Sequence, residues 1–87
     1  MLTNGNVEVG ITAVLIKASD ADGIRLSIGV ANATGVFLGD ENVTKDNGLK
    51  LVNSDGYMTI ELAPDEAIYG ITASGTSDVR WVATMNG

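Results

Sequence analysis

The sequence predicts an all-β fold, a small antiparallel β-sandwich or barrel of about seven to eight short strands with at most one helical turn. Short apolar segments follow one another, separated by Gly, Asn, Asp and Ser clusters roughly every eight to twelve residues. Several segments alternate apolar and polar residues, which is the period of a pleated strand. We expect strands over Val7–Val9, Ile11–Lys17, Ile24–Ala31, Val36–Leu38, Leu49–Val52, Tyr57–Leu62, Ile68–Ala73 and Val79–Met85.

The first two strands differ in their expected surroundings. Residues 1–6 are polar and are expected to form a flexible arm before Val7–Val9, which ends at Gly10. The apolar run inside Ile11–Lys17 is continuous, and such a run is typical of a strand buried on both faces.

The alternation is clearest in the third strand, Ile24–Ala31. The apolar residues on one of its faces are Ile24, Leu26, Ile28 and Val30. The other face is small apart from Arg25, so another surface can approach it closely. Asn32–Gly35 predicts a hairpin turn that leads to the return strand Val36–Leu38, and a polar loop from Gly39 to Gly48 follows.

Turn signals frame the strand Tyr57–Leu62. Asn53–Gly56 precedes it and marks the end of Leu49–Val52. Ala63–Ala67 follows it, and Pro64 there suits the first position of a helical turn.

We expect Ala67–Met85 to form a hairpin that seeds the core, because it holds the only Trp and one of the two Tyr residues. Gly75 in its polar linker supplies the positive φ that short hairpin loops often need. One face of its second strand carries Val79, Trp81, Ala83 and Met85, and the other carries Arg80, Val82 and Thr84.

The composition predicts a single β domain over residues 1–87 that associates with copies of itself. A domain of this size has a marginal core, and small domains usually compensate with disulfides, metals or association. The chain has no Cys and no His, which excludes disulfides and the usual structural zinc sites. Because 45% of the residues are hydrophobic, we expect a homo-oligomer held by an apolar surface.

The charge disfavours two classes of partner. The net charge is −6, and the five cationic residues are spread along the chain without forming a basic stripe. We therefore expect no nucleic-acid partner and no membrane partner. No signal peptide and no membrane-spanning run is visible.

The sequence predicts no catalytic, cofactor or metal residues. Asp20–Gly23 lacks the ligand spacing of a calcium loop, and the acids of the Gly39–Gly48 loop show no recognisable spacing, so solvated turns are favoured in both places. Without His or Cys there is no nucleophilic triad, and no Gly-Lys-Ser/Thr phosphate loop occurs. Two paired carboxylates acting as a small hydrolase remain an alternative.

Residues Ile24 to Trp81 resemble small all-β bacteriophage virion proteins of the capsid decoration or cement type. The features that carry the resemblance are the alternating strand Arg25–Ala31 ending at Asn32, Val36–Gly39, Val43–Thr44, Asn47–Gly48, Gly56, Ala67–Ala73, Gly75–Thr76 and Val79–Arg80. The resemblance implies a structural protein of the virion, made in the host cytoplasm, that binds the head shell and has no enzymatic activity.

The resemblance also implies partners. These are the major capsid protein or another virion protein, together with two further copies of the chain in a trimer. The start of the chain is expected to pack against a neighbour by strand addition. We expect the interface to include Val7, Val9, Phe37, Tyr69 and Trp81. The alternative is a tail, fibre or head-spike module that binds a carbohydrate or a receptor through exposed aromatic residues and the Gly39–Gly48 loop.

Overall fold

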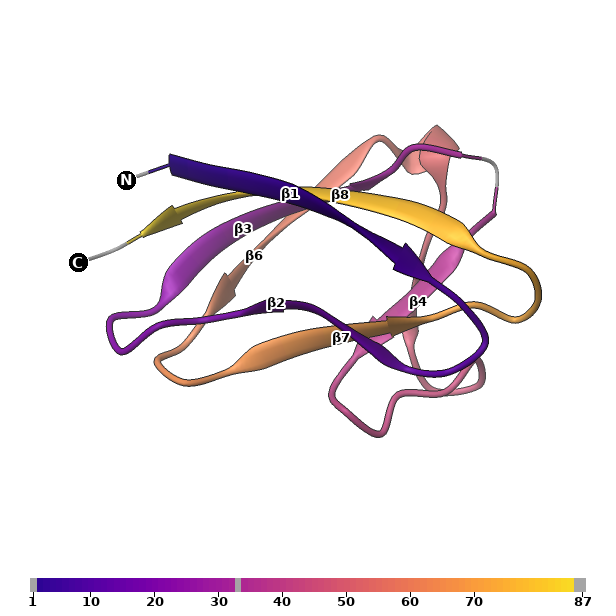
Figure 1. The fold of residues 1–87 in the computed structure, drawn as a ribbon, viewed down its shortest axis with the longest axis horizontal. Coiled ribbons are helices and arrows are strands. Elements are labelled where there is room, and N and C mark those ends of the chain that lie inside the picture. The colour runs from indigo at the N-terminus through magenta and orange to yellow at the C-terminus, as the bar shows by residue number, and fades with distance from the viewer. Residues whose placement is uncertain (1, 33, 86–87) are drawn as a thin grey trace.

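Two four-stranded antiparallel sheets form the fold, as the sequence predicts (Figure 1). The computed structural model describes residues 2–32 and 34–85, without the side chain of Met85. Sheet A has the strand order β1-β8-β3-β6, and sheet B has the order β2-β7-β4-β5. The elements are β1 (Leu2–Val9), β2 (Val14–Ala18), β3 (Ile24–Val30), β4 (Val36–Gly39), β5 (Leu49–Leu51), a 3-10 turn (Asn53–Asp55), β6 (Tyr57–Leu62), β7 (Ala67–Ile71) and β8 (Ser77–Met85).

The strands pair as one long hairpin that is rolled up. β1 pairs with β8, β2 with β7, β3 with β6 and β4 with β5, all antiparallel. The tip of this hairpin is the loop between β4 and β5, and rolling brings β8 beside β3 and β7 beside β4. This nested pairing of eight strands in two sheets is the jelly-roll topology.

The core lies between the two sheets. The predicted inner face of β3 is buried, and Ile24, Leu26 and Ile28 are almost completely inaccessible. The predicted faces of β8 are also confirmed, because Val79 and Ala83 are buried whereas Arg80, Val82 and Thr84 are exposed. Sheet B contributes Ile16, Val36, Leu38, Leu51 and Ile68 to the same core.

Both predicted hairpins are wrong, because the strands on either side of each loop belong to different sheets. β7 and β8 flank residues 72–76, which carry the chain from sheet B to sheet A. β3 and β4 likewise flank residues 31–35 and lie in separate sheets; Ala33 of that predicted turn lies outside the described residues. A connection of about five residues is long enough to cross the roughly 10 Å between stacked sheets. Gly75 has the expected positive φ of 70°, but in a crossover.

The structure corrects two predictions, namely that residues 1–6 form a flexible arm and that the strand Ile11–Lys17 is buried on both faces. The part of the arm that is described, Leu2 to Asn6, belongs to β1 and pairs with β8, because every second residue there faces the other sheet. Met1 lies outside the described residues. β2 is buried on one face only, and Leu15 remains 42% exposed because its outer side has no covering layer.

The helical turn forms elsewhere in the chain. Residues 63–66 make a tight turn closed by the Glu66 amide, which donates to the Ala63 carbonyl oxygen at 3.1 Å. Asp65 has a φ of 64° there, which is incompatible with a right-handed helical turn. The 3-10 turn lies instead at Asn53–Asp55, where the Asp55 carboxylate accepts a hydrogen bond from the Val52 amide.

Candidate functional site

The outer face of sheet B carries four apolar side chains that form one patch. They come from β2, β4 and β7, the strands that lie together in the lower layer of Figure 1. The strand register places Leu15 opposite Tyr69, and Ile71 opposite Phe37. Leu15 is exposed, and the other three side chains are half-buried. We call Leu15, Phe37, Tyr69 and Ile71 the apolar face.

Sheet B is free of acidic residues, although the chain carries a net charge of −6. Its four strands contain no Asp or Glu, and their only charged residues are Lys17 and Lys50. The Lys50 ammonium lies 5.8 Å from the centroid of the Phe37 ring, at the border of the apolar face. The carboxylates lie in the loops and on sheet A, so the strands that carry the apolar face contain none.

The structure brings together two of the five predicted interface residues. Phe37 and Tyr69 both belong to the apolar face. Val7, Val9 and Trp81 lie on the inner side of sheet A instead. Val9 is fully buried, so its side chain is not available to a partner, and Val7 packs against the core.

Trp81 has a structural role between the two sheets. A side chain at Gly5 would meet the indole ring, with Cζ2 only 2.8 Å from the added carbon, so the ring lies directly over Gly5. From sheet B, the Lys17 ammonium lies 4.7 Å from the ring centroid. This cation–π contact links the two sheets.

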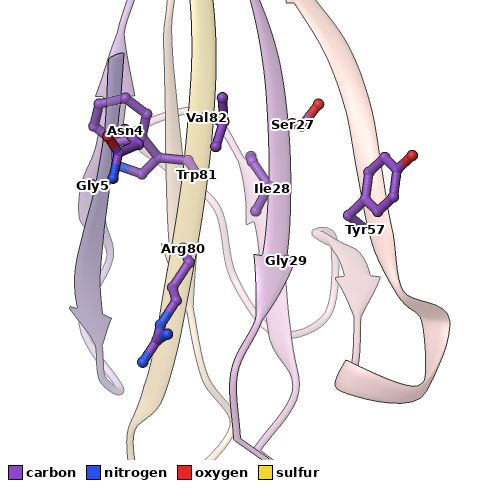
Figure 2. Close-up of a pocket in the computed structure, with 9 residues that line it drawn as sticks. All are labelled: Asn4, Gly5, Ser27, Ile28, Gly29, Tyr57, Arg80, Trp81 and Val82. Carbon is purple, nitrogen blue, oxygen red and sulfur yellow. The ribbon is translucent and has the colours of Figure 1, made fainter. Parts of the chain in front are cut away.

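A second feature, an open hollow of about 560 Å³, lies on sheet A. Its floor is Gly29, which the register places between Arg80 on β8 and Tyr57 on β6. Figure 2 shows Arg80 and Tyr57 on either side of Gly29. Val82 lies further along β8, and Ser27 further along β3. Because glycine has no side chain, the outer face of the sheet is depressed at this point.

The acidic loops are held by their own carboxylates. Asp20 accepts a hydrogen bond from the Asp22 amide at 2.9 Å, and Asp40 accepts one from the Asn42 amide at the same distance. These are the local turns that short acidic side chains favour. Within the described ranges, no group of three or more Asp or Glu residues gathers closely enough to hold a metal ion.

The ion pairs of the described residues are exposed. Arg25 pairs with Glu61 and Arg80 with Asp78, each at 3.1 Å. Exposed pairs of this kind contribute at most about 1 kcal/mol. No helix in the part of the chain that the structure describes has the length and apolar character needed to cross a bilayer.

Sequence reasoning does not identify Leu15 and Ile71. Ile71 has a signal, because it follows Tyr69 by two residues and therefore shares its face. Leu15 has none, because it lies inside a continuous apolar run whose two faces look alike in sequence. Its place depends on which side of β2 receives the core.

Comparison with known proteins establishes the fold. No protein-family model matches the chain, and no curated protein sequence matches it. Among solved structures, one match comes from work described as "Bacillus endospore appendages form a novel family of disulfide-linked pili". The match has a TM-score of 0.52 and 10% sequence identity, and it covers 100% of this chain and 88% of the other.

Proposed function

We propose that this chain is a non-enzymatic structural subunit of a repeating protein assembly and that it associates through the apolar face. The observation that carries the proposal is the contrast between the two sheets. The outer face of sheet A carries charged side chains of both signs beside the exposed Leu2, Tyr57 and Val82, whereas that of sheet B carries the apolar face and no carboxylate.

The occupant that fits the apolar face is a second copy of the chain. Two molecules that each carry a charge of −6 repel one another, and the repulsion is smallest where acids are absent. Contact through sheet B keeps the acidic loops at the rim of the interface, where water screens them. Charged residues are depleted and aromatic residues enriched at the centre of interfaces, as Phe37 and Tyr69 would be here.

The energy available suits an assembly of several copies. Full burial of one large apolar side chain is worth about 1.5–3 kcal/mol, so a half-buried one gains about 1 kcal/mol from the rest. Four such side chains on each of two copies are worth about 8 kcal/mol, which is comparable with the cost of association of about 4–15 kcal/mol. Contacts repeated around a ring or along a shell add further binding energy, which favours the trimer over a dimer.

Within this class, we propose a capsid decoration protein of a bacteriophage head, with the major capsid protein as its partner. The resemblance over Ile24 to Trp81 supports this role, and the jelly roll is an architecture that viral capsid domains use. A tail, fibre or head-spike module is the second candidate. The match to an appendage protein supports the broader structural role. With no cysteine, this chain would assemble without the disulfides named for those pili.

Electron microscopy with gold-labelled antibodies tests the location. Particles and cell surfaces from the producing culture are stained with an antibody raised against the purified chain. We expect regularly spaced label on phage heads. Label confined to tail tips or spikes would favour the second candidate, and label on cellular filaments or on no particle would contradict a virion role.

A further inference from the structure

We propose that the hollow over Gly29 is a binding site for a neutral sugar ring of a glycan. The hollow lies on sheet A, so this proposal does not rest on the apolar face of sheet B. Its volume of about 560 Å³ falls within the range of small-molecule sites, about 300–1,000 Å³.

The geometry provides two different walls. Arg80 and Tyr57 lie on strands on either side of Gly29, which separates their backbones by two strand spacings, or about 10 Å. The Tyr57 ring is 74% exposed and offers a flat apolar surface. The opposite wall is Arg80, and Asn4, which the register places opposite Val82, lies further along that side of the hollow (Figure 2).

This combination matches the surface of a pyranose. A sugar ring has an apolar face of C–H groups and a rim of hydroxyls. The C–H face would lie on Tyr57, and the rim would accept hydrogen bonds from Arg80 and Asn4. The Ser27 hydroxyl, which lies 3.1 Å from the Thr59 hydroxyl, offers a further donor or acceptor at the edge of the hollow.

Charge selects a neutral sugar over an acidic one. The guanidinium of Arg80 is already paired with the Asp78 carboxylate at 3.1 Å. Glu8 lies directly opposite Asp78 on β1, so this corner of the sheet has more negative than positive charge. A carboxylated sugar would meet repulsion there, and the whole chain at −6 would add to it.

The backbone conformation does not require glycine at position 29. The φ of Gly29 lies outside the left-handed region, and a carbon added there would meet its nearest neighbours, the Gly56 oxygen and Tyr57 Cβ, at 3.7 Å. The first carbon of a side chain is therefore accommodated at this position, and the rest of a larger side chain would project into the hollow. This allows binding to be removed without removing the fold.

The test is a titration of the full chain with oligosaccharides, in which binding is measured through shifts of the amide NMR signals. The probes are neutral di- to tetrasaccharides built from glucose, galactose, mannose and N-acetylglucosamine, with trigalacturonate as the acidic counterpart. We expect at least one neutral probe to shift the amide signals of Tyr57 and Val82. Gly29→Val should abolish these shifts, and Tyr57→Ala should weaken binding about tenfold, the equivalent of one lost aromatic contact.

The control is Tyr69→Lys on the opposite sheet, which should leave binding unchanged even where it disrupts association. The proposal is overturned if no neutral probe shifts these signals, if the shifts persist in both Gly29→Val and Tyr57→Ala, or if trigalacturonate binds more tightly than every neutral probe. Tyr57 is exposed, so its replacement by Ala keeps the test valid should Gly29→Val fold poorly.

Discussion

Gly70 on β7 is a core-facing position where one added methyl group should destabilise the protein. Its inner side faces the core, and a carbon added there would lie 2.8 Å from Ile16 Cδ1 and 3.1 Å from Val36 Cγ2. Carbon atoms in contact prefer about 3.5–4.0 Å. Both neighbours are buried. The branched Val36 side chain has little freedom to rotate, and Ile16 Cδ1, at the end of its side chain, can move only into the packed core.

The expected cost follows from two opposing effects. Overfilling a packed core costs about 1–3 kcal/mol. Replacing a strand glycine by alanine returns about 0.5–1 kcal/mol, because the unfolded chain loses freedom. Gly70→Ala should therefore lower the free energy of unfolding by up to about 2.5 kcal/mol, and each 1 kcal/mol should lower the Tm by about 4–8 °C for a chain of this size.

Gly29→Ala is the matched control. Its added carbon meets neighbours only at 3.7 Å, so there is no cost of overfilling. The free energy of unfolding should therefore rise by about 0.5–1 kcal/mol. Urea unfolding, monitored by the fluorescence of Trp81, the only Trp, measures the stability of both variants. The slope of the unfolding free energy against urea concentration should stay unchanged. If Gly70→Ala proved as stable as Gly29→Ala, the described packing between β7 and the core would be wrong.

Three further substitutions test separate contacts in the same unfolding assay. Thr3→Val should raise stability by about 1 kcal/mol, because the buried Thr3 hydroxyl has no hydrogen-bond partner among the described residues; an unchanged midpoint would mean that the hydroxyl is satisfied. Asp65→Gly should raise it by about 0.5–1 kcal/mol, because Asp65 has a φ of 64°, and a loss would show that the Asp65 side chain stabilises the turn. Ser77→Ala should lower it by about 1–2 kcal/mol, since the buried hydroxyl donates to the Thr34 carbonyl oxygen at 2.8 Å; equal stability would rule out that hydrogen bond.

The strands and their faces could be predicted because alternation is a local property. In β3 and β8 each side chain's face follows from its neighbours along the chain, and the structure confirms both predicted faces. Pairing is not local. The loop at residues 72–76 is compatible with a hairpin, but β8 lies between β1 and β3 in sheet A and not beside β7.

The start of the chain shows the same limit. Leu2 to Asn6 is polar and reads as an arm, yet its backbone is paired with β8. Gly5 lies there under the Trp81 ring, and this packing depends on a residue more than seventy positions away. Composition describes exposure in this segment well and its secondary structure poorly.

The two surface features differ in how far the sequence reveals them. Phe37 and Tyr69 stand out as aromatic residues, so half of the apolar face was predictable. The hollow was not, because its lining comes from β1, β3, β6 and β8, which only the sheet order brings together. The small outer face of β3 was the one local sign of it.

Sedimentation equilibrium of the wild-type chain beside Tyr69→Lys and Tyr57→Lys tests the central claim most directly. The two tyrosines lie on the outer faces of opposite sheets, so they form a matched pair. We expect the wild type and Tyr57→Lys to sediment as trimers and Tyr69→Lys to fall to the 9.0 kDa mass of one chain, because an ammonium would be desolvated at the centre of the apolar face. A wild-type chain that is monomeric, or a Tyr69→Lys variant with the wild-type mass, would contradict assembly through sheet B.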